Sequence, residues 1–221
     1  MTQKDYSLRH GLQLLVSDFM LIFPFLLSFV VALIVEAVAG SVSLAFSLHG
    51  FFDNGYNMLL LPLGTIIFDS AIVFIVILIE AFGVIWQSEA ASVRSKGYRF
   101  GLESSFRSAA ASTSKYAWIL VFMALIGAAI NFIPFFGGSL SNLWFAYSAY
   151  ALMLSLLTGR TFRDTLSRGT DSLQKMYDSE STTGIFFVLV IVVSLVPVFS
   201  ELAILIEVIL GSAVIVRYES K

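Results

Sequence analysis

The chain has no cysteine, and only 13% of its 221 residues are charged. Without cysteine, it can form no disulfide, no thiolate nucleophile and no Cys-ligated metal site. Soluble domains are typically about a quarter charged, so these charges are too few to cover the surface of a soluble domain of this size. The net charge of −2 gives no indication of a nucleic-acid partner.

Hydrophobic residues, in contrast, make up 58% of the chain, including 21 phenylalanines, and the mean hydropathy is +0.89. A bilayer allows the outer surface of a protein to be apolar, provided that every backbone polar group is satisfied internally. The composition therefore predicts an all-α fold, a polytopic transmembrane helix bundle that forms one membrane domain over residues 1–221.

Stretches of about 20 apolar residues mark the membrane-crossing helices. We predict single crossings at residues 19–40, 58–86, 117–136 and 140–157, the second one tilted or broken near Pro62. The stretch 184–216 is too long for one crossing and has Pro197, Ser200 and Glu201 at its middle. It is predicted to form a hairpin of two short helices, which gives about six crossings, and a re-entrant pair is the alternative.

The basic residues fix the orientation of these crossings. All 13 lie in the N-terminal segment, the segments 87–116 and 158–183, or the C-terminus, and the links 41–57, 136–139 and 197–201 contain none. Six crossings place all of them on one side of the membrane, which the positive-inside rule identifies as the cytoplasm. We therefore expect a multi-pass protein of the cell membrane with both termini in the cytoplasm.

Three apolar stripes precede membrane segments and predict amphipathic helices in the cytoplasmic interface. They consist of Leu8, Leu12, Leu15, Val16 and Phe19; of Leu102, Phe106, Ala109, Ala110 and Thr113; and of Phe162, Leu166, Gly169, Leu173 and Met176. Thr161 and Asp164 form a capping box at the start of the third. An amphipathic helix followed by two crossings suggests repeat units at 7–86, 100–157 and 161–217, although any cytoplasmic loop beside a membrane tends to be amphipathic.

Two runs carry a resemblance to known proteins. The run RFGLESSFR at Arg99 to Arg107, followed by small residues and an apolar helix, resembles a broad group of uncharacterised prokaryotic six-helix membrane proteins. The run TFRDTLSRG from Thr161 resembles a later amphipathic element of that group. Some of its members are described as membrane domains of glycerophosphodiester phosphodiesterases and others as Yip1-like. The resemblance implies an architecture and no activity.

A weaker likeness, in the run NFIPFFG from Asn131, is to CysZ-type sulfate permeases. No crossing contains a Lys or Arg, and the acids in the crossings disfavour the passage of an anion.

Intramembrane acids are the candidate functional residues, because a charge at bilayer depth is costly. Asp69 and Glu80 are eleven residues apart, about 20° from the same helix face and roughly 16 Å apart along the axis. Glu207 lies inside the last helix, whereas Glu36 and Glu201 are expected nearer the outer interface and solvated. The buried acids could line a proton or cation path. They could instead be neutral and bond between helices to Asn131, Ser70, Thr65 or Ser148, or pair with a Lys or Arg of a partner subunit.

The segment 87–116 carries the basic residues Arg94, Lys96, Arg99, Arg107 and Lys115 against Glu89 and Glu103. Its excess of positive charge could attract anionic lipid head groups, or it could simply set the topology. In the segment 158–183, four acids balance four basic residues, so no such attraction is expected there.

No enzymatic motif of the HExxH, P-loop or GxSxG type is present, and His10 and His49 are expected on opposite sides of the membrane. We therefore predict no metal, no cofactor and no catalytic activity. The predicted function is that of a non-catalytic scaffold or subunit of a membrane complex. The alternative is a small transporter or channel for protons, cations or a small solute. The expected partners are membrane lipids, other membrane subunits or further copies of the chain.

Overall fold

A computed structural model describes residues 7–53, 60–98, 101–133 and 135–219, with the backbone alone for 43–53, 60–63, 197 and 217–219. The described residues are almost entirely helical and contain no strand. This confirms the prediction of an all-α bundle.

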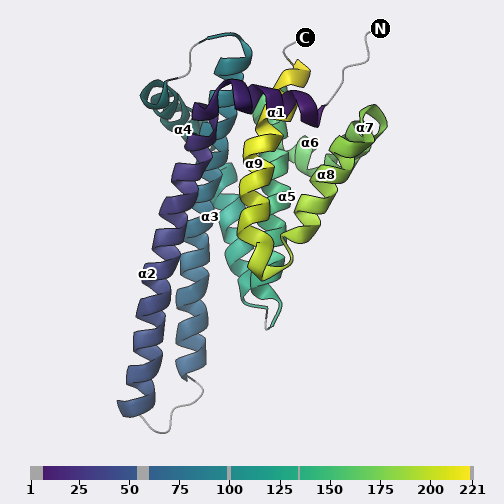
Figure 1. The fold of residues 1–221 in the computed structure, drawn as a ribbon. Coiled ribbons are helices and arrows are strands. Elements are labelled where there is room, and N and C mark those ends of the chain that lie inside the picture. The colour runs from purple at the N-terminus through teal and green to yellow at the C-terminus, as the bar shows by residue number, and fades with distance from the viewer. Residues whose placement is uncertain (1–6, 54–59, 99–100, 134, 220–221) are drawn as a thin grey trace.

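Nine α-helices and one short 3-10 helix follow each other in the described chain. In order they are α1 (Leu8–Ser17), η1 (Phe19–Ile22), α2 (Phe23–Asp53), α3 (Leu60–Ser95), α4 (Leu102–Asn131), α5 (Gly137–Thr158), α6 (Phe162–Ser167), α7 (Gly169–Ser179), α8 (Ser181–Val193) and α9 (Pro197–Glu219). The long helices α2, α3, α4, α5 and α9 form the bundle, and α1 lies across one end of it (Figure 1). The α3–α4 connection and the end of α9 lie at that same end, which we call the α1 end.

Five of the helices in the described residues are long and apolar enough to cross a membrane. They correspond to Phe19–Val42, Gly64–Ser95, Leu102–Asn131, Gly137–Thr158 and Val198–Val216. The sixth apolar helix, α8, has only 13 residues, or about 20 Å, against the roughly 30 Å thickness of a hydrocarbon core. In Figure 1 the α8–α9 turn stops well above the far end of α2 and α3.

Several helices are longer than the apolar stretches that predicted them. α2 continues to Asp53, although a link was expected from residue 41, and α3 runs from Leu60 without a break near Pro62. Pro62 falls in the first turn of α3, where the N–H that proline lacks would have no partner within the helix. The expected loop 87–116 consists largely of the end of α3 and the start of α4, joined by a turn in which Gly97 has a φ of +81°.

The amphipathic helices are confirmed in part. Thr161 caps α6 as predicted, since its hydroxyl accepts a hydrogen bond from the Asp164 N–H (3.2 Å). The Asp164 carboxylate accepts from the Thr161 hydroxyl (2.6 Å), whereas a full capping box uses the Thr161 N–H, so the predicted box is formed in part. Phe162, Gly169 and Met176 are buried as the stripe requires, but Arg168 divides this segment into α6 and α7. The second stripe does not form a separate helix, because α4 is continuous from Leu102 to Asn131.

The first and third predicted units thus show an amphipathic helix before two apolar helices, whereas the middle unit shows one fused helix followed by α5. That the three units are structural repeats stays a prediction.

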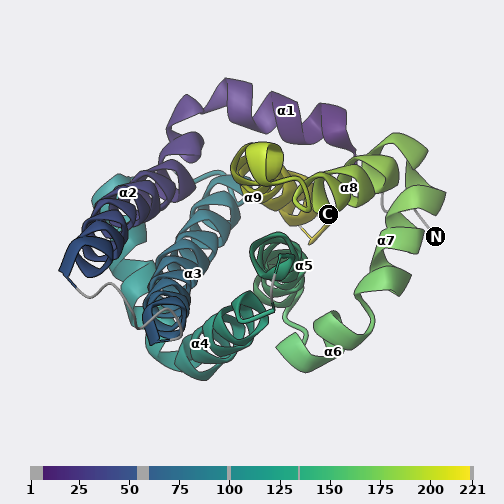
Figure 2. The same ribbon diagram turned by 90° about the horizontal axis from the view of Figure 1, so that it is seen from below.

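The core is centred on α5, which Figure 2 shows enclosed by α3, α4, α8 and α9. Residues 148–155 of α5 are all buried, as expected of a helix with neighbours on every side. Gly127 of α4 allows close approach here: a Cβ at this position would overlap the Ile77 side chain of α3 and lie 3.2 Å from the Ser141 hydroxyl of α5. Small residues are the usual means of packing membrane helices.

Candidate functional site

The acids inside the bundle are the candidate site, and Glu207 is the most deeply buried of them. It lies in α9 and has no exposed surface. One turn further along α9, a Cβ on Gly211 would lie 2.9 Å from Phe187 of α8 and 3.2 Å from Met153 of α5. Because residues four apart share a helix face, Glu207 is on the side of α9 that faces α5 and α8.

Within the described part of the chain, neither carboxyl oxygen of Glu207 has a hydrogen-bond partner. Buried polar groups in proteins are nearly always hydrogen-bonded, since an unsatisfied one carries its full desolvation cost. The interpretation of the acids as neutral groups bonded between helices therefore fails for Glu207. Ser148, one of the proposed partners, instead donates to the carbonyl of Phe145 in its own helix (3.0 Å).

Asp69 and Glu80 do not share one buried seam. Glu80 is 4% exposed, whereas Asp69 is exposed. The two acids are on a similar face of α3, but the helices that cover this face differ along its length. Glu201 is within electrostatic range of Glu80, and α9 begins only four residues before Glu201, at Pro197. Asp69 lies roughly 16 Å further from the α1 end, beyond the start of α9.

Asn131 takes part in a bond between helices, but not to an acid. Its side-chain amide donates to the hydroxyl of Ser70 at 3.5 Å, which links the far end of α4 to α3. Ser70 is buried, whereas its neighbour Asp69 is exposed. At this depth, α3 therefore packs against other helices through the side that carries Ser70.

Glu36, Glu80 and Glu201 approach one another from three different helices, and we call them the acid cluster. Glu80 of α3 lies within electrostatic range of Glu36 of α2 and Glu201 of α9, and these two lie within range of each other. Glu36 and Glu201 are half-buried, and that they lie near the outer interface stays a prediction. Among the described residues no group of three acids or histidines is arranged to hold a metal ion.

Sequence analysis missed this cluster because α9 is far from α2 and α3 in the chain, and because the pairing of positions between α2 and α3 depends on how the two helices pack. It also missed Gln87 of α3, which is fully buried. Its side-chain oxygen accepts from the Phe25 N–H at the start of α2, and its amide donates to Ser212 of α9, both at 3.3 Å. Gln87 thus joins the three helices that carry the acid cluster. The sequence carries no clear signal for it, because Gln87 follows the predicted crossing 58–86 directly and precedes the polar Ser88 and Glu89.

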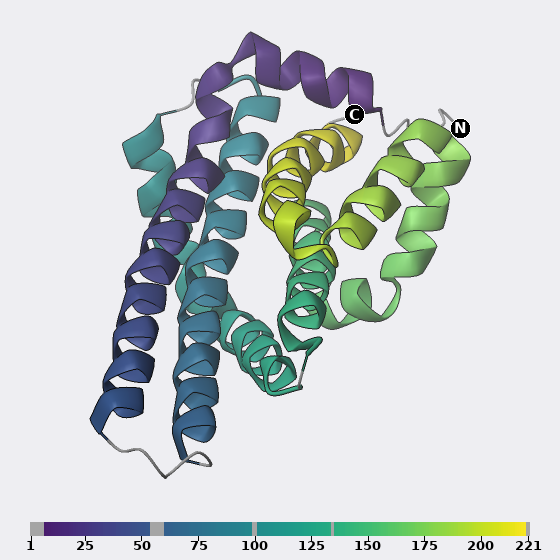
Figure 3. The ribbon, with the colours of Figure 1, turned by 60° about the horizontal axis from the view of Figure 1, so that its bottom comes forward.

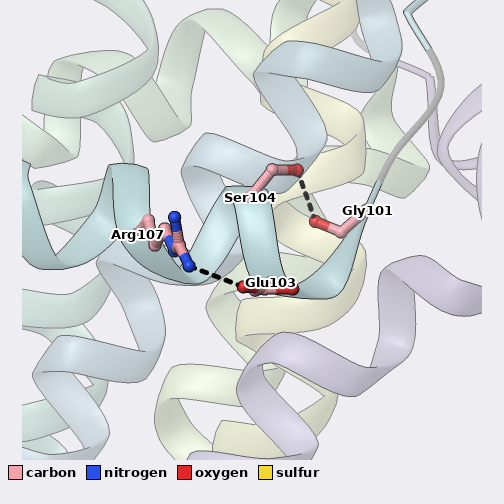
Figure 4. A network of polar contacts seen from close by, with 4 residues as sticks. All are labelled: Gly101, Glu103, Ser104 and Arg107. Atoms are coloured by element: carbon pink, nitrogen blue, oxygen red, sulfur yellow. Dashed lines mark hydrogen bonds and ion pairs between the residues drawn. The ribbon is translucent and has the colours of Figure 1, made fainter.

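The basic residues predicted to face lipid differ from one another in their surroundings. Arg94 forms a partly buried ion pair with Asp18, at 2.9 Å, which ties the end of α3 to η1. Arg107 pairs with Glu103 at 2.8 Å on the exposed first turns of α4, as Figure 4 shows. Lys96 is exposed, and the Lys115 ammonium lies 5.5 Å from the centroid of the Tyr116 ring. Arg99 lies outside the described residues.

Glu180, between α7 and α8, anchors the start of α1. Its carboxylate accepts hydrogen bonds from the Leu8 N–H (3.2 Å) and the Thr183 hydroxyl (2.7 Å). Burial alone would raise the pKa of Glu180, but the bonds from Thr183, Leu8, Ser7 and Thr182 outweigh it and lower the pKa below its ordinary value of 4.5. The ionised form therefore holds α1 against the α7–α8 connection.

The fold and these acids define a class: a multi-pass α-helical membrane protein whose interior contains carboxyl groups without basic partners in the described chain. No protein-family model, no curated protein and no solved structure matches the chain.

Proposed function

We propose that the chain is a non-catalytic subunit of a complex in the cell membrane, oriented with both termini in the cytoplasm. The observation that supports this is the acid cluster. No Lys or Arg occurs between Arg9 and Arg94 or between Lys175 and Arg217, so α2 and the apolar parts of α3 and α9 provide no cation for it. A membrane helix of a partner subunit would bring the missing Lys or Arg.

The exposure of the three acids fits this role. Glu80 is closed off inside the bundle, whereas Glu36 and Glu201 are half-buried. Leu33, three residues before Glu36 and on the same side of α2, is apolar and exposed. A partner helix lying there would bury apolar surface and supply a cation to acids that are costly when unpaired.

The test measures the mass of the assembly after extraction from native membranes into lipid-containing discs. The wild-type chain is expected to run as a complex larger than its own 24.3 kDa. Glu36→Gln with Glu201→Gln should release it as the lone chain, because neutral amides do not attract a buried cation. Glu103→Gln with Asp178→Asn removes two acids at the α1 end and should leave the complex intact. A double cluster variant of unchanged mass would refute the proposal.

A second candidate function, proton or cation transport, is favoured by Glu207. A fully buried carboxyl with two unsatisfied oxygens is suited to bind and release a proton, and intramembrane acids often mark such paths. In proteoliposomes of the purified chain with an imposed pH gradient, Glu207→Gln or Glu80→Gln should then abolish flux while expression is unchanged. If the path continues along α3, Asp69→Asn should lower the flux as well. Flux that is absent in the wild type, or unchanged in the Glu207 and Glu80 variants, would exclude this function.

A further inference from the structure

A pocket of about 570 Å³ lies beside the end of α5, between that end and the helices α6 and α7. Its charged lining residues are Arg160, Arg168, Lys175, Asp164 and Asp171. α6 and α7 lie against the side of the bundle, outside α5 and α8, as seen along the bundle in Figure 2 and obliquely in Figure 3.

Hydrogen bonds to α5 hold the frame of this pocket. The Tyr147 hydroxyl donates to the Leu166 carbonyl (2.7 Å), and the Ser155 hydroxyl donates to the Arg160 carbonyl (2.7 Å). Gly169, at the start of α7, makes room for this contact, since a Cβ there would lie 2.6 Å from the Tyr147 oxygen. The backbone that carries the three cations is therefore fixed to the most buried helix of the molecule.

The three cations are available for a ligand. Among the described residues, neither Arg160, Arg168 nor Lys175 forms an ion pair with a carboxylate. Asp164, in contrast, is engaged by the Thr161 hydroxyl and caps α6. The pocket thus combines three cations with two carboxylates, Asp164 and Asp171, and has an excess of positive charge although the segment as a whole has no net charge.

Trp118 indicates the depth of the pocket in the membrane. Its ring is 62% exposed, and its centroid lies 6.5 Å from that of Phe162, the first residue of α6. Exposed tryptophans of membrane proteins concentrate at the level of the lipid head groups. With the basic residues on the cytoplasmic side, this is the leaflet in which anionic lipids generate a negative surface potential.

We propose that this pocket binds a phosphate group, presented by the head group of an anionic glycerophospholipid. Arg160 and Arg168 supply planar donors suited to phosphate oxygens, and Lys175 supplies a compact positive charge. Asp171 accepts hydrogen bonds from head-group hydroxyls and disfavours ligands with more negative charge. The proposal is independent of the acid cluster and of its partner.

The experiment titrates the full purified chain in neutral detergent with short-chain phosphatidylglycerol or phosphatidylcholine, and counts bound lipids by native mass spectrometry. The wild type is expected to bind phosphatidylglycerol at least about tenfold more tightly. Arg168→Gln should weaken this binding about fivefold, and further loss should follow when Arg160→Gln and Lys175→Gln are added. Arg163→Gln, which removes the same charge from α6 outside the pocket, should change it less than about twofold.

Inorganic phosphate and glycerol 3-phosphate distinguish the source of the phosphate. Displacement of the lipid by millimolar amounts of either would assign the pocket to soluble phosphate compounds, and no displacement would assign it to lipid. Equal binding of the two lipids by the wild type, or equal loss in the Arg163 and Arg168 variants, would overturn the proposal. Should the arginine variants fail to fold, Asp171→Asn decides, because it must strengthen the binding of phosphatidylglycerol, and unchanged binding refutes the site.

Discussion

At the scale of single residues, the unusual groups are polar side chains held where the membrane offers no water. Glu207 is the extreme case, with no exposed surface and, among the residues that the structure describes, no hydrogen-bond partner for either oxygen. Gln87 shows the opposite arrangement, since it is equally buried but bonded at both ends of its amide. The first is costly to the fold and the second supports it, which makes Glu207 the better candidate for a function.

Replacement of Glu207 tests this difference through stability. Glu207→Leu should raise the free energy of unfolding by about 1–3 kcal/mol, because it removes an unsatisfied buried group of similar volume. Glu207→Gln should bring no such gain, because the amide would be equally unpartnered. Thermal unfolding of the purified chain measures both, with Glu103→Gln on the exposed start of α4 as the control. A destabilised leucine variant would show that the carboxyl has a ligand or partner.

Glu180 predicts a pH dependence. Its pKa is lower in the folded chain than in the unfolded chain, so its contribution to stability is present above the unfolded value of 4.5 and is lost as the pH falls through the lowered value. Glu180→Gln should therefore melt at a lower temperature than the wild type at pH 7. The difference should shrink steadily below pH 4.5. A difference that is the same at pH 7 and at acid pH would contradict the assigned role.

At the scale of elements, the close packing of α2 on α3 depends on Gly83. A Cβ at this position would lie 2.6 Å from the Ser28 Cβ and 2.9 Å from the Phe25 ring of α2. At Gly64 of the same helix, by comparison, a Cβ would meet no described atom within 4 Å. The two glycines therefore separate the effect of helix contact from the effect of helix propensity.

Gly83→Ala should destabilise the protein by about 1–3 kcal/mol, because the backbones of α2 and α3 must move apart. Gly64→Ala should be neutral or stabilise it by up to about 1 kcal/mol, because alanine favours the helix. Thermal unfolding of the two variants in the same detergent gives the comparison. Equal effects of both substitutions would show that α2 and α3 are not in close contact at Gly83.

At the scale of the whole molecule, the chain enters and leaves at the α1 end, and all of its described basic residues lie toward that end or on α6 and α7. A crossing hairpin and a re-entrant hairpin at α8 and α9 both satisfy this distribution, since both return the chain to the same side. The shortness of α8 favours the re-entrant form. Val198, beside the turn, is 84% exposed and apolar, as expected for a turn that ends in lipid.

The absence of native cysteine makes this topology directly measurable with single reporters and a membrane-impermeant maleimide. Phe135→Cys, at the fully exposed α4–α5 turn, should be labelled on intact cells. Asp178→Cys should be labelled only after the membrane is opened, and Val198→Cys should be protected in both conditions. Labelling of the Val198 variant from outside, as fast as that of the Phe135 variant, would instead show that α8 crosses the membrane.

Composition and the spacing of apolar residues determined much of this protein by themselves. The membrane class, the all-helical fold, the approximate spans and the Thr161–Asp164 cap all follow from local properties of the chain, because length, hydropathy and capping need no tertiary contact. Helix ends were less predictable. α2 and α3 continue into polar residues, since a helix once formed is extended at little cost.

Only the tertiary structure decided which polar groups meet. It separated the exposed Asp69 from the buried Glu80, because different helices pack against α3 at different points along its length. It also brought Glu36 and Glu201, from two other helices, within electrostatic range of Glu80. It also gathered Arg160, Arg168 and Lys175 into one pocket, within a segment whose charges cancel in the sequence. Charge in a sequence is a sum, whereas binding depends on where each charge lies, and that position is fixed by packing.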